Sequence, residues 1–288
     1  MTDLLSNFPE RWLPHVKCES VDWAGAGTTR KYYILMTGRC GSTHLVDLLR
    51  NTNKLGWPEE YFNERLFDGF AMGQDSGSFC QYLSTIAEKC GRGGIFGFKI
   101  DIFRLLSVLQ LVNFPNIFPP SDTSLMVMTR IDILTQAYSF AVARATGEWH
   151  DTSNASITRD YDPSDKELWF ELFLLASAET KIEKYVIDSG RNALRFTYED
   201  LLQDRNGLLE RIFFHIGVDL VPSQENSESH GTSVRAINYN DRQKVIRKFK
   251  STYRVLLEEL ISNRTTFNWS GTVLLYEAID EICFNEQA

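Results

Sequence analysis

The residues with the clearest chemistry in this sequence lie in a short loop, TGRCGST, at positions 37–43. An apolar stretch precedes the loop and an amphipathic stretch follows it, which predicts a strand, a turn and a helix. Gly38 and Gly41 allow a sharp turn and let backbone N–H groups approach an anion. Arg39 adds a planar cation suited to phosphate or sulfate oxygens. The pattern predicts an anion-binding loop, and its alternative is a plain tight connection.

The helix side of the loop narrows the choice of anion. Ser42 and Thr43 add hydroxyl donors at the positive N-terminal end of the predicted helix. A Walker A loop would place a lysine before Ser42, and its absence argues against Mg-ATP. Cys40 beside a cationic residue raises the alternative of a thiolate nucleophile. A phosphatase loop would need an arginine where Val46 stands, so a structural cysteine is the favoured interpretation.

Two further segments carry groups that suit chemistry on an anion. Glu59 and Glu60 follow the first predicted helix, where a carboxylate can remove a proton from an attacking hydroxyl group. The alternative is a solvated acidic turn. Arg130 ends an apolar stretch and Ser139 follows nine residues later, which suits a second phosphate. A surface salt bridge is the alternative for this arginine.

Strands and helices are expected to alternate along the chain and to position these groups. Continuous apolar runs predict buried strands at 32–37, 95–100, 124–129 and 192–198. Helical patterns cover 42–51, 133–145, 163–190, 198–204, 206–217 and 242–261. This alternation predicts an α/β fold with a mainly parallel sheet, and ligands of such sheets bind at the carboxyl ends of the strands.

The ends of the long helix and the domain limits can also be predicted. Ser164 and Glu167 form a capping box, and Gly190 is expected to stop the helix. We expect an N-terminal extension at 1–30 and one α/β domain at 31–264, with a helical elaboration at about 145–190. A C-terminal tail is expected at 265–288.

The bulk composition excludes several classes of protein. The chain has 288 residues, 43% of them hydrophobic, and a formal net charge of −8. Such a chain is not expected to coat nucleic acid. Five scattered cysteines without a CxxC pair indicate neither a disulfide framework nor a zinc site. No signal peptide or membrane-spanning run is recognisable, so a cytoplasmic location is expected.

Taken together, the segments resemble the PAPS-dependent sulfotransferases, and most closely the bacterial carbohydrate sulfotransferases of the trehalose 2-sulfotransferase type. The resemblance rests on RCGSTHLVDLLRNTNKLGWPEEYF, on GFK at 97–99, on RIDILTQAYSFAVARA and on YEDL at 198–201. It spans about 32–217. It implies a P-loop-like parallel sheet flanked by helices, the sulfotransferase fold.

The resemblance also implies a donor site for 3′-phosphoadenosine-5′-phosphosulfate (PAPS), with no metal. The loop would hold the 5′-phosphosulfate through Arg39, Cys40, Gly41, Ser42 and Thr43. The 3′-phosphate and the adenine would be held by Arg130, Ser139, Tyr198 and Arg235.

In the catalytic roles that the resemblance implies, Glu60 is the general base, with Glu59 as its rival, and Lys99 stabilises charge on the transferred group. Arg39 would assist. The acceptor would be a hydroxylated small molecule, a carbohydrate or a glycolipid, and a homodimer is expected. The sequence departs from the family pattern at Trp57, so trehalose itself is not assumed.

Two points about the resemblance stay open. Four aromatic residues are candidates for stacking on the acceptor, with core packing as the alternative: Trp57, Tyr61, Phe62 and Trp149. A P-loop kinase with a degenerate loop and a non-catalytic nucleotide-binding module are the competing functions.

Overall fold

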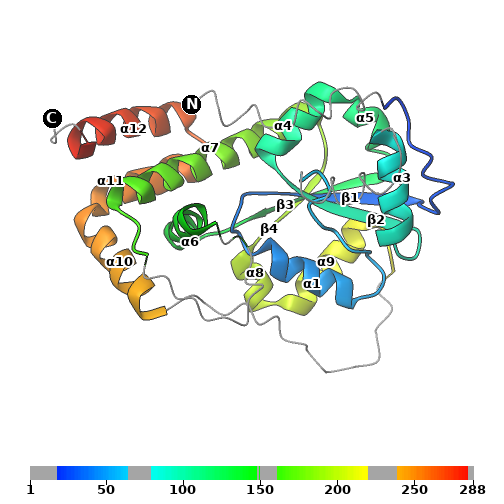
Figure 1. Cartoon of the computed structure of the whole chain (residues 1–288), viewed down its shortest axis with the longest axis horizontal. Coiled ribbons are helices and arrows are strands. Elements are labelled where there is room, and N and C mark those ends of the chain that lie inside the picture. The colour runs from blue at the N-terminus through cyan, green and yellow to red at the C-terminus, as the bar shows by residue number, and fades with distance from the viewer. Residues whose placement is uncertain (1–17, 64–78, 148, 150–160, 220–238, 285–288) are drawn as a thin grey trace. The chain divides into compact units, whose positions relative to one another are not determined.

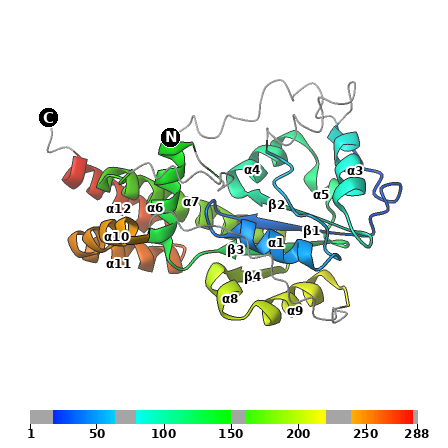
Figure 2. The same ribbon diagram turned by 60° about the horizontal axis from the view of Figure 1, so that its bottom comes forward.

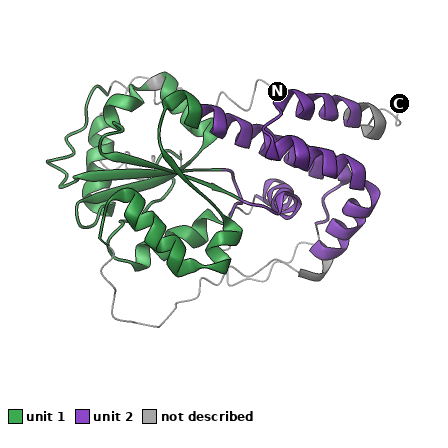
Figure 3. Cartoon of the chain, turned by 180° about the vertical axis from the view of Figure 1, so that it is seen from behind, with its two compact units in different colours: residues 1–36, 41–129, 186–229 green, residues 37–40, 130–185, 230–288 purple. Residues whose placement is uncertain are grey.

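The computed structural model describes residues 18–63, 79–147, 149, 161–219 and 239–284. The chain divides into two compact units, which Figure 3 colours separately. Unit 1 contains residues 1–36, 41–129 and 186–229, and unit 2 contains residues 37–40, 130–185 and 230–288. Each unit is described by itself.

Unit 1 is built on a four-stranded parallel sheet in the order β2-β1-β3-β4 (Figure 1). Its strands are β1 (Arg30–Met36), β2 (Ile95–Asp101), β3 (Thr123–Thr129) and β4 (Ala193–Thr197). All three pairings are parallel, and the register places Ile34 between Lys99 and Met126. The predicted α/β fold with a parallel sheet is confirmed, because the apolar runs form strands whose side chains are largely buried on both faces.

Helices cover both faces of this sheet. On one face α1 (Ser42–Asn51) lies beside α8 (Tyr198–Gln203) and α9 (Arg205–Ile216), and His44 of α1 contacts both Tyr198 and Arg205. On the other face lie α4 (Ile102–Leu111) and α5 (Phe114–Ile117), as Figures 1 and 2 show. Helix α3 (Phe79–Cys90) precedes β2. The sequence analysis had not predicted α3, α4 or α5.

Unit 2 consists of helices around an aromatic core. They are α6 (Ile133–Thr146), α7 (Asp165–Ser189) up to Tyr185, α10 (Tyr239–Thr252), α11 (Arg254–Thr265) and α12 (Trp269–Phe284). Trp169 of α7 is fully buried and contacts Phe173, Phe249 and Tyr253. Helix α12 lies in the segment that was expected to be a C-terminal tail.

Two predictions about helix ends have opposite outcomes. The capping box at the start of α7 is confirmed, because Ser164 and Glu167 exchange hydrogen bonds of 2.8 and 3.3 Å, and Gly190 follows the helix with a φ of 61°. The single helix predicted at 242–261 is wrong. It is two helices that meet at Tyr253, whose ring packs on Trp169 and whose hydroxyl donates to Asp165.

One disulfide, between Cys18 and Cys80, departs from the expectation that the cysteines form no disulfide framework. The two residues are 62 positions apart, and α3 brings Cys80 against the segment before β1. That segment also packs on unit 1 through Trp23, which contacts Phe96 and donates to the Ile117 carbonyl at 3.0 Å. Cysteine count alone could not show this long-range contact. Among the described residues, no helix combines the length and apolarity needed to span a membrane.

Candidate active site

The loop between β1 and α1 has the conformation that an anion-binding turn requires. Arg39 and Gly41 have left-handed φ values of 61° and 87°. Helix α1 begins at Ser42, and Gly41, the residue that caps it, has no side chain that could satisfy the N–H groups of the first turn. A Cβ atom at Gly41 would lie 2.2 Å from Tyr198 Cδ2, so glycine is required here. Thr43 is exposed and Ser42 is buried.

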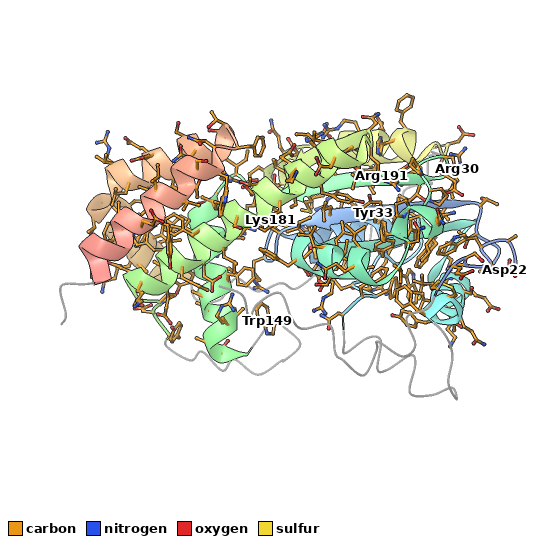
Figure 4. The ribbon with its side chains drawn as sticks, turned by 90° about the horizontal axis from the view of Figure 1, so that it is seen from above. Asp22, Arg30, Tyr33, Trp149, Lys181 and Arg191 are labelled. Carbon is orange, nitrogen blue, oxygen red and sulfur yellow. A yellow bond between two sulfur atoms is a disulfide. The ribbon has the colours of Figure 1, made fainter. Side chains whose placement is uncertain are left out.

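The side chain of Arg39 belongs to a group of cations and hydroxyls in unit 2. Its Nε donates to Ser139 Oγ at 3.0 Å, and its Nη1 donates to the Trp149 carbonyl. Trp149 follows α6 in the chain and is labelled in Figure 4. Burial lowers the pKa of Arg39, and the nearby charge of Arg130 lowers it further. Two guanidinium groups that repel each other in this way favour an anion as a common partner.

Gln136 fixes the loop and was missed by the sequence analysis. Its Nε2 donates to Thr37 Oγ1 at 2.8 Å and to the Gly38 carbonyl at 2.7 Å, and its side chain is fully buried. The available signal was its position in α6, three residues before Ser139. Residues three apart on a helix share one face, so a buried glutamine there can reach the same loop.

The candidate base and the candidate lysine form an ion pair in unit 1. Lys99 Nζ lies 3.3 Å from Glu60 Oε1, with the lysine 2% and the glutamate 33% exposed. The Lys99 backbone N–H also donates to the Glu59 carbonyl at 3.1 Å, which fixes this segment beside β2. Of the two neighbouring glutamates, Glu60 is therefore the one whose carboxylate forms an ion pair with Lys99.

A small cleft at the carboxyl end of β2 contains this ion pair. It is lined by Glu60, Phe62, Asn63, Lys99, Ile100, Asp101 and Arg104. Asp101 caps α4 by accepting a hydrogen bond from the Arg104 N–H at 2.9 Å. Burial raises the pKa of the Asp101 carboxyl, and the charge of Glu60 adds to this effect against the opposing Arg104. The sequence analysis had not selected Asp101, although it follows Lys99 by two residues on the same strand.

Of the four aromatic candidates for stacking on the acceptor, two belong to the core of unit 1. Tyr61 and Phe62 are buried, where they pack on Phe96 and Phe98. The Trp57 ring contacts the guanidinium groups of Arg50 and Arg92, and the Trp57 backbone N–H donates to the Cys90 carbonyl. The Trp149 ring meets Phe140 edge-on at 5.6 Å. For Tyr61 and Phe62 the core alternative is correct.

Three further residues were predicted to bind the donor: Cys40, Tyr198 and Arg235. Cys40 is fully buried. The Tyr198 ring lies against Gly41 and 6.4 Å from the His44 ring. Arg235 lies outside the described residues. In the described part of the chain, no three His, Cys, Asp or Glu side chains gather as metal ligands.

Chemically, the described groups offer three functions. The start of α1 offers uncapped N–H groups and two hydroxyls. Arg39 and Arg130, with Ser139, offer cations and a hydroxyl for a phosphate. Glu60 offers a base beside the ammonium of Lys99.

No protein-family model matches the sequence, and no curated protein matches it either. Among solved structures, a mouse sulfotransferase, SULT7A1 complexed with PAP, is 13% identical with a TM-score of 0.43, over 84% of this chain and 70% of that one. Retinol dehydratase in a complex with retinol and PAP is 14% identical with a TM-score of 0.39, over 69% of this chain and 65% of that one. These likenesses are distant.

Proposed function

We propose that this chain transfers the sulfuryl group of PAPS to a hydroxyl group of a carbohydrate or glycolipid acceptor. The observation that carries the proposal is the pairing of Glu60 with Lys99 at 3.3 Å, at the carboxyl end of β2. A carboxylate held by a buried ammonium gives a proton acceptor and a charge stabiliser at one place. The motifs that resemble sulfotransferases support the same reaction.

The proposed reaction is an in-line displacement at sulfur. The acceptor hydroxyl gives its proton to Glu60, and its oxygen forms the new bond to sulfur. The bond between sulfur and the bridging oxygen breaks, and its electron pair stays on the 5′-phosphate, which leaves 3′-phosphoadenosine 5′-phosphate (PAP). Lys99 stabilises the negative charge on the sulfuryl and bridging oxygens. Positioning and electrostatic stabilisation supply most of the rate enhancement.

The donor-binding roles are proposed residue by residue. In unit 1, the N–H groups at the start of α1 with Ser42 and Thr43 bind the 5′-phosphosulfate, because this helix end has no side-chain cap. In unit 2, Arg130 and Ser139 bind the 3′-phosphate. Because Arg39 donates a hydrogen bond to Ser139, Arg39 is proposed to contact the same phosphate.

Three further parts of the proposal rest on the resemblance alone. Tyr198 is the proposed partner of the adenine, and Arg235 is proposed to close over the 3′-phosphate. A homodimer in the cytoplasm is the proposed state of the protein.

Thermal unfolding with nucleotides tests this function and its kinase alternative. We expect PAP to raise the Tm, because a ligand at about 100 times its Kd adds about 2.7 kcal/mol, or several degrees for a chain of this size. AMP, which lacks the 3′-phosphate, should raise it much less, and Arg130→Ala should remove most of this difference. A rise with Mg-ATP but not with PAP would support the kinase, and no rise with any nucleotide would contradict donor binding.

A further inference from the structure

Asp101 places a second carboxyl group in the cleft that holds the Glu60–Lys99 pair. Lys99 and Asp101 are two residues apart on β2, so their side chains leave the same face of the sheet. Both line the cleft together with Glu60. Lys99 is buried, and Asp101 as a whole residue is half-buried.

Capping of α4 does not explain why this residue is an aspartate. Its Oδ1 accepts the hydrogen bond from the Arg104 N–H, and an asparagine would cap the helix equally well. The charge of Glu60 disfavours ionisation of this carboxyl, whereas the charge and the N–H of Arg104 and the N–H of Phe103 favour it. The two carboxylate oxygens offer about four acceptor positions, more than these two backbone N–H groups occupy. The remaining acceptor capacity, on the wall of the cleft, points to a ligand there.

We propose that Asp101 binds a second hydroxyl group of the acceptor, next to the hydroxyl that gives its proton to Glu60. This inference rests on the proposed function and narrows its substrate class. An acceptor that meets both carboxylates carries neighbouring hydroxyl groups, as a pyranose ring does. A phenol or a monohydric alcohol has only one. Asn63 and Arg104, on the wall of the same cleft, add donors for further sugar oxygens.

The test compares Asp101→Asn with a matched variant of another helix cap. Asp204 caps α9 by accepting from the Gly207 N–H at 2.9 Å, and it is exposed. Asp204→Asn therefore makes the same chemical change outside the cleft. Transfer of radiolabelled sulfate from PAPS would be measured for wild type and both variants. The acceptors are a panel of methyl hexopyranosides and cyclohexanol, a ring with one hydroxyl.

We expect wild type to prefer at least one pyranoside over cyclohexanol. Asp101→Asn should lower kcat/KM for that pyranoside about tenfold or more, mainly through KM, the usual effect of losing a hydrogen bond to a charged group. For this variant, kcat/KM for cyclohexanol should change less than about twofold. The rise in Tm that PAP causes should likewise stay within about twofold of the wild-type rise. Asp204→Asn should match wild type, and equal Tm values of the two variants would show that Asp101→Asn folds.

Two results would overturn the role of Asp101 while leaving the sulfotransferase proposal intact. One is an equal loss toward the pyranoside and cyclohexanol. The other is a wild-type protein that PAP stabilises but that transfers sulfate to no pyranoside. Absence of stabilisation by PAP would instead overturn the proposed function, and this inference with it.

Discussion

At the residue scale, the burial of Lys99 explains why its partner is the strongest candidate for the base. An ammonium that is 2% exposed is costly unless a carboxylate compensates it, and the fold supplies Glu60 at 3.3 Å. The carboxylate remains one-third exposed, so an acceptor can reach it. Glu59 contributes its backbone carbonyl to the Lys99 N–H. The two neighbouring glutamates thus have different roles in the structure.

This difference predicts the outcome of two matched substitutions. Glu60→Gln should lower turnover about 10²–10⁴-fold, because the proposed base is lost. Its PAP-induced shift in Tm should persist, since the donor groups are unchanged. Glu59→Gln should retain turnover within a few-fold of wild type. The measurement is the steady-state rate of each variant with saturating PAPS. A large loss for Glu59→Gln with little loss for Glu60→Gln would make Glu59 the base.

The sequence points to candidate site residues but not to their contacts in the fold. Arg39 and Glu60 were selected from local motifs, Ser139 from its nine-residue step after Arg130, and Lys99 from the family resemblance. The hydrogen bond from Arg39 to Ser139 joins residues 100 positions apart, so no local pattern could reveal it. The buried Gln136 was missed for the same reason, since its partners come from a distant loop.

At the scale of elements, α3 supports the segment that carries Glu60. The Tyr82 hydroxyl of α3 donates to the Tyr61 carbonyl, and Phe79 packs on Phe62 at 5.8 Å. The sequence gives no clear signal that α3 lies here, whereas the strands are predicted within two residues because their apolar runs are continuous. The break at Tyr253 was missed because tertiary packing, and not local propensity, ends α10.

Removing one hydroxyl from α3 tests this support. Tyr82→Phe should increase hydrogen exchange of the amides at 60–63 and lower kcat several-fold, with the PAP-induced shift in Tm unchanged. Tyr32→Phe is the matched control, because the Tyr32 hydroxyl is also buried and donates to the Leu55 carbonyl at 2.7 Å. Each variant should lose about 1 kcal/mol of stability. Equal exchange at 60–63 in both variants would show that Tyr82 does not position this segment.

At the scale of the whole molecule, the charge and the disulfide bear on where and how the protein works. A net charge of −8 would repel the proposed polyanionic donor at long range, so its binding would depend on local cations such as the proposed Arg39 and Arg130. The cytoplasmic location expected from the sequence stays a prediction. The Cys18–Cys80 disulfide weighs against it, because disulfides persist mainly in oxidising compartments.

The disulfide makes a prediction about stability that is independent of function. It closes a loop of 62 residues, for which the chain-entropy model gives about 4 kcal/mol. Dithiothreitol should therefore lower the Tm of wild type by several degrees. Cys80→Ser should have this lower Tm already and should not respond to dithiothreitol. Equal Tm values for the oxidised wild type and for Cys80→Ser would show that the crosslink does not constrain the unfolded chain.

The same pair of cysteines reports the location of the protein in the cell. If the chain resides in a reducing cytoplasm, Cys18 and Cys80 should react with an alkylating reagent during lysis under denaturing conditions. If it resides in an oxidising compartment, both should be protected until a reductant is added. Cys40 and Cys90, which are buried cysteines outside this disulfide, serve as internal controls because they should react in either case once the chain is unfolded. Protection of Cys18 and Cys80 alone would overturn the cytoplasmic prediction and leave the sulfuryl-transfer proposal intact.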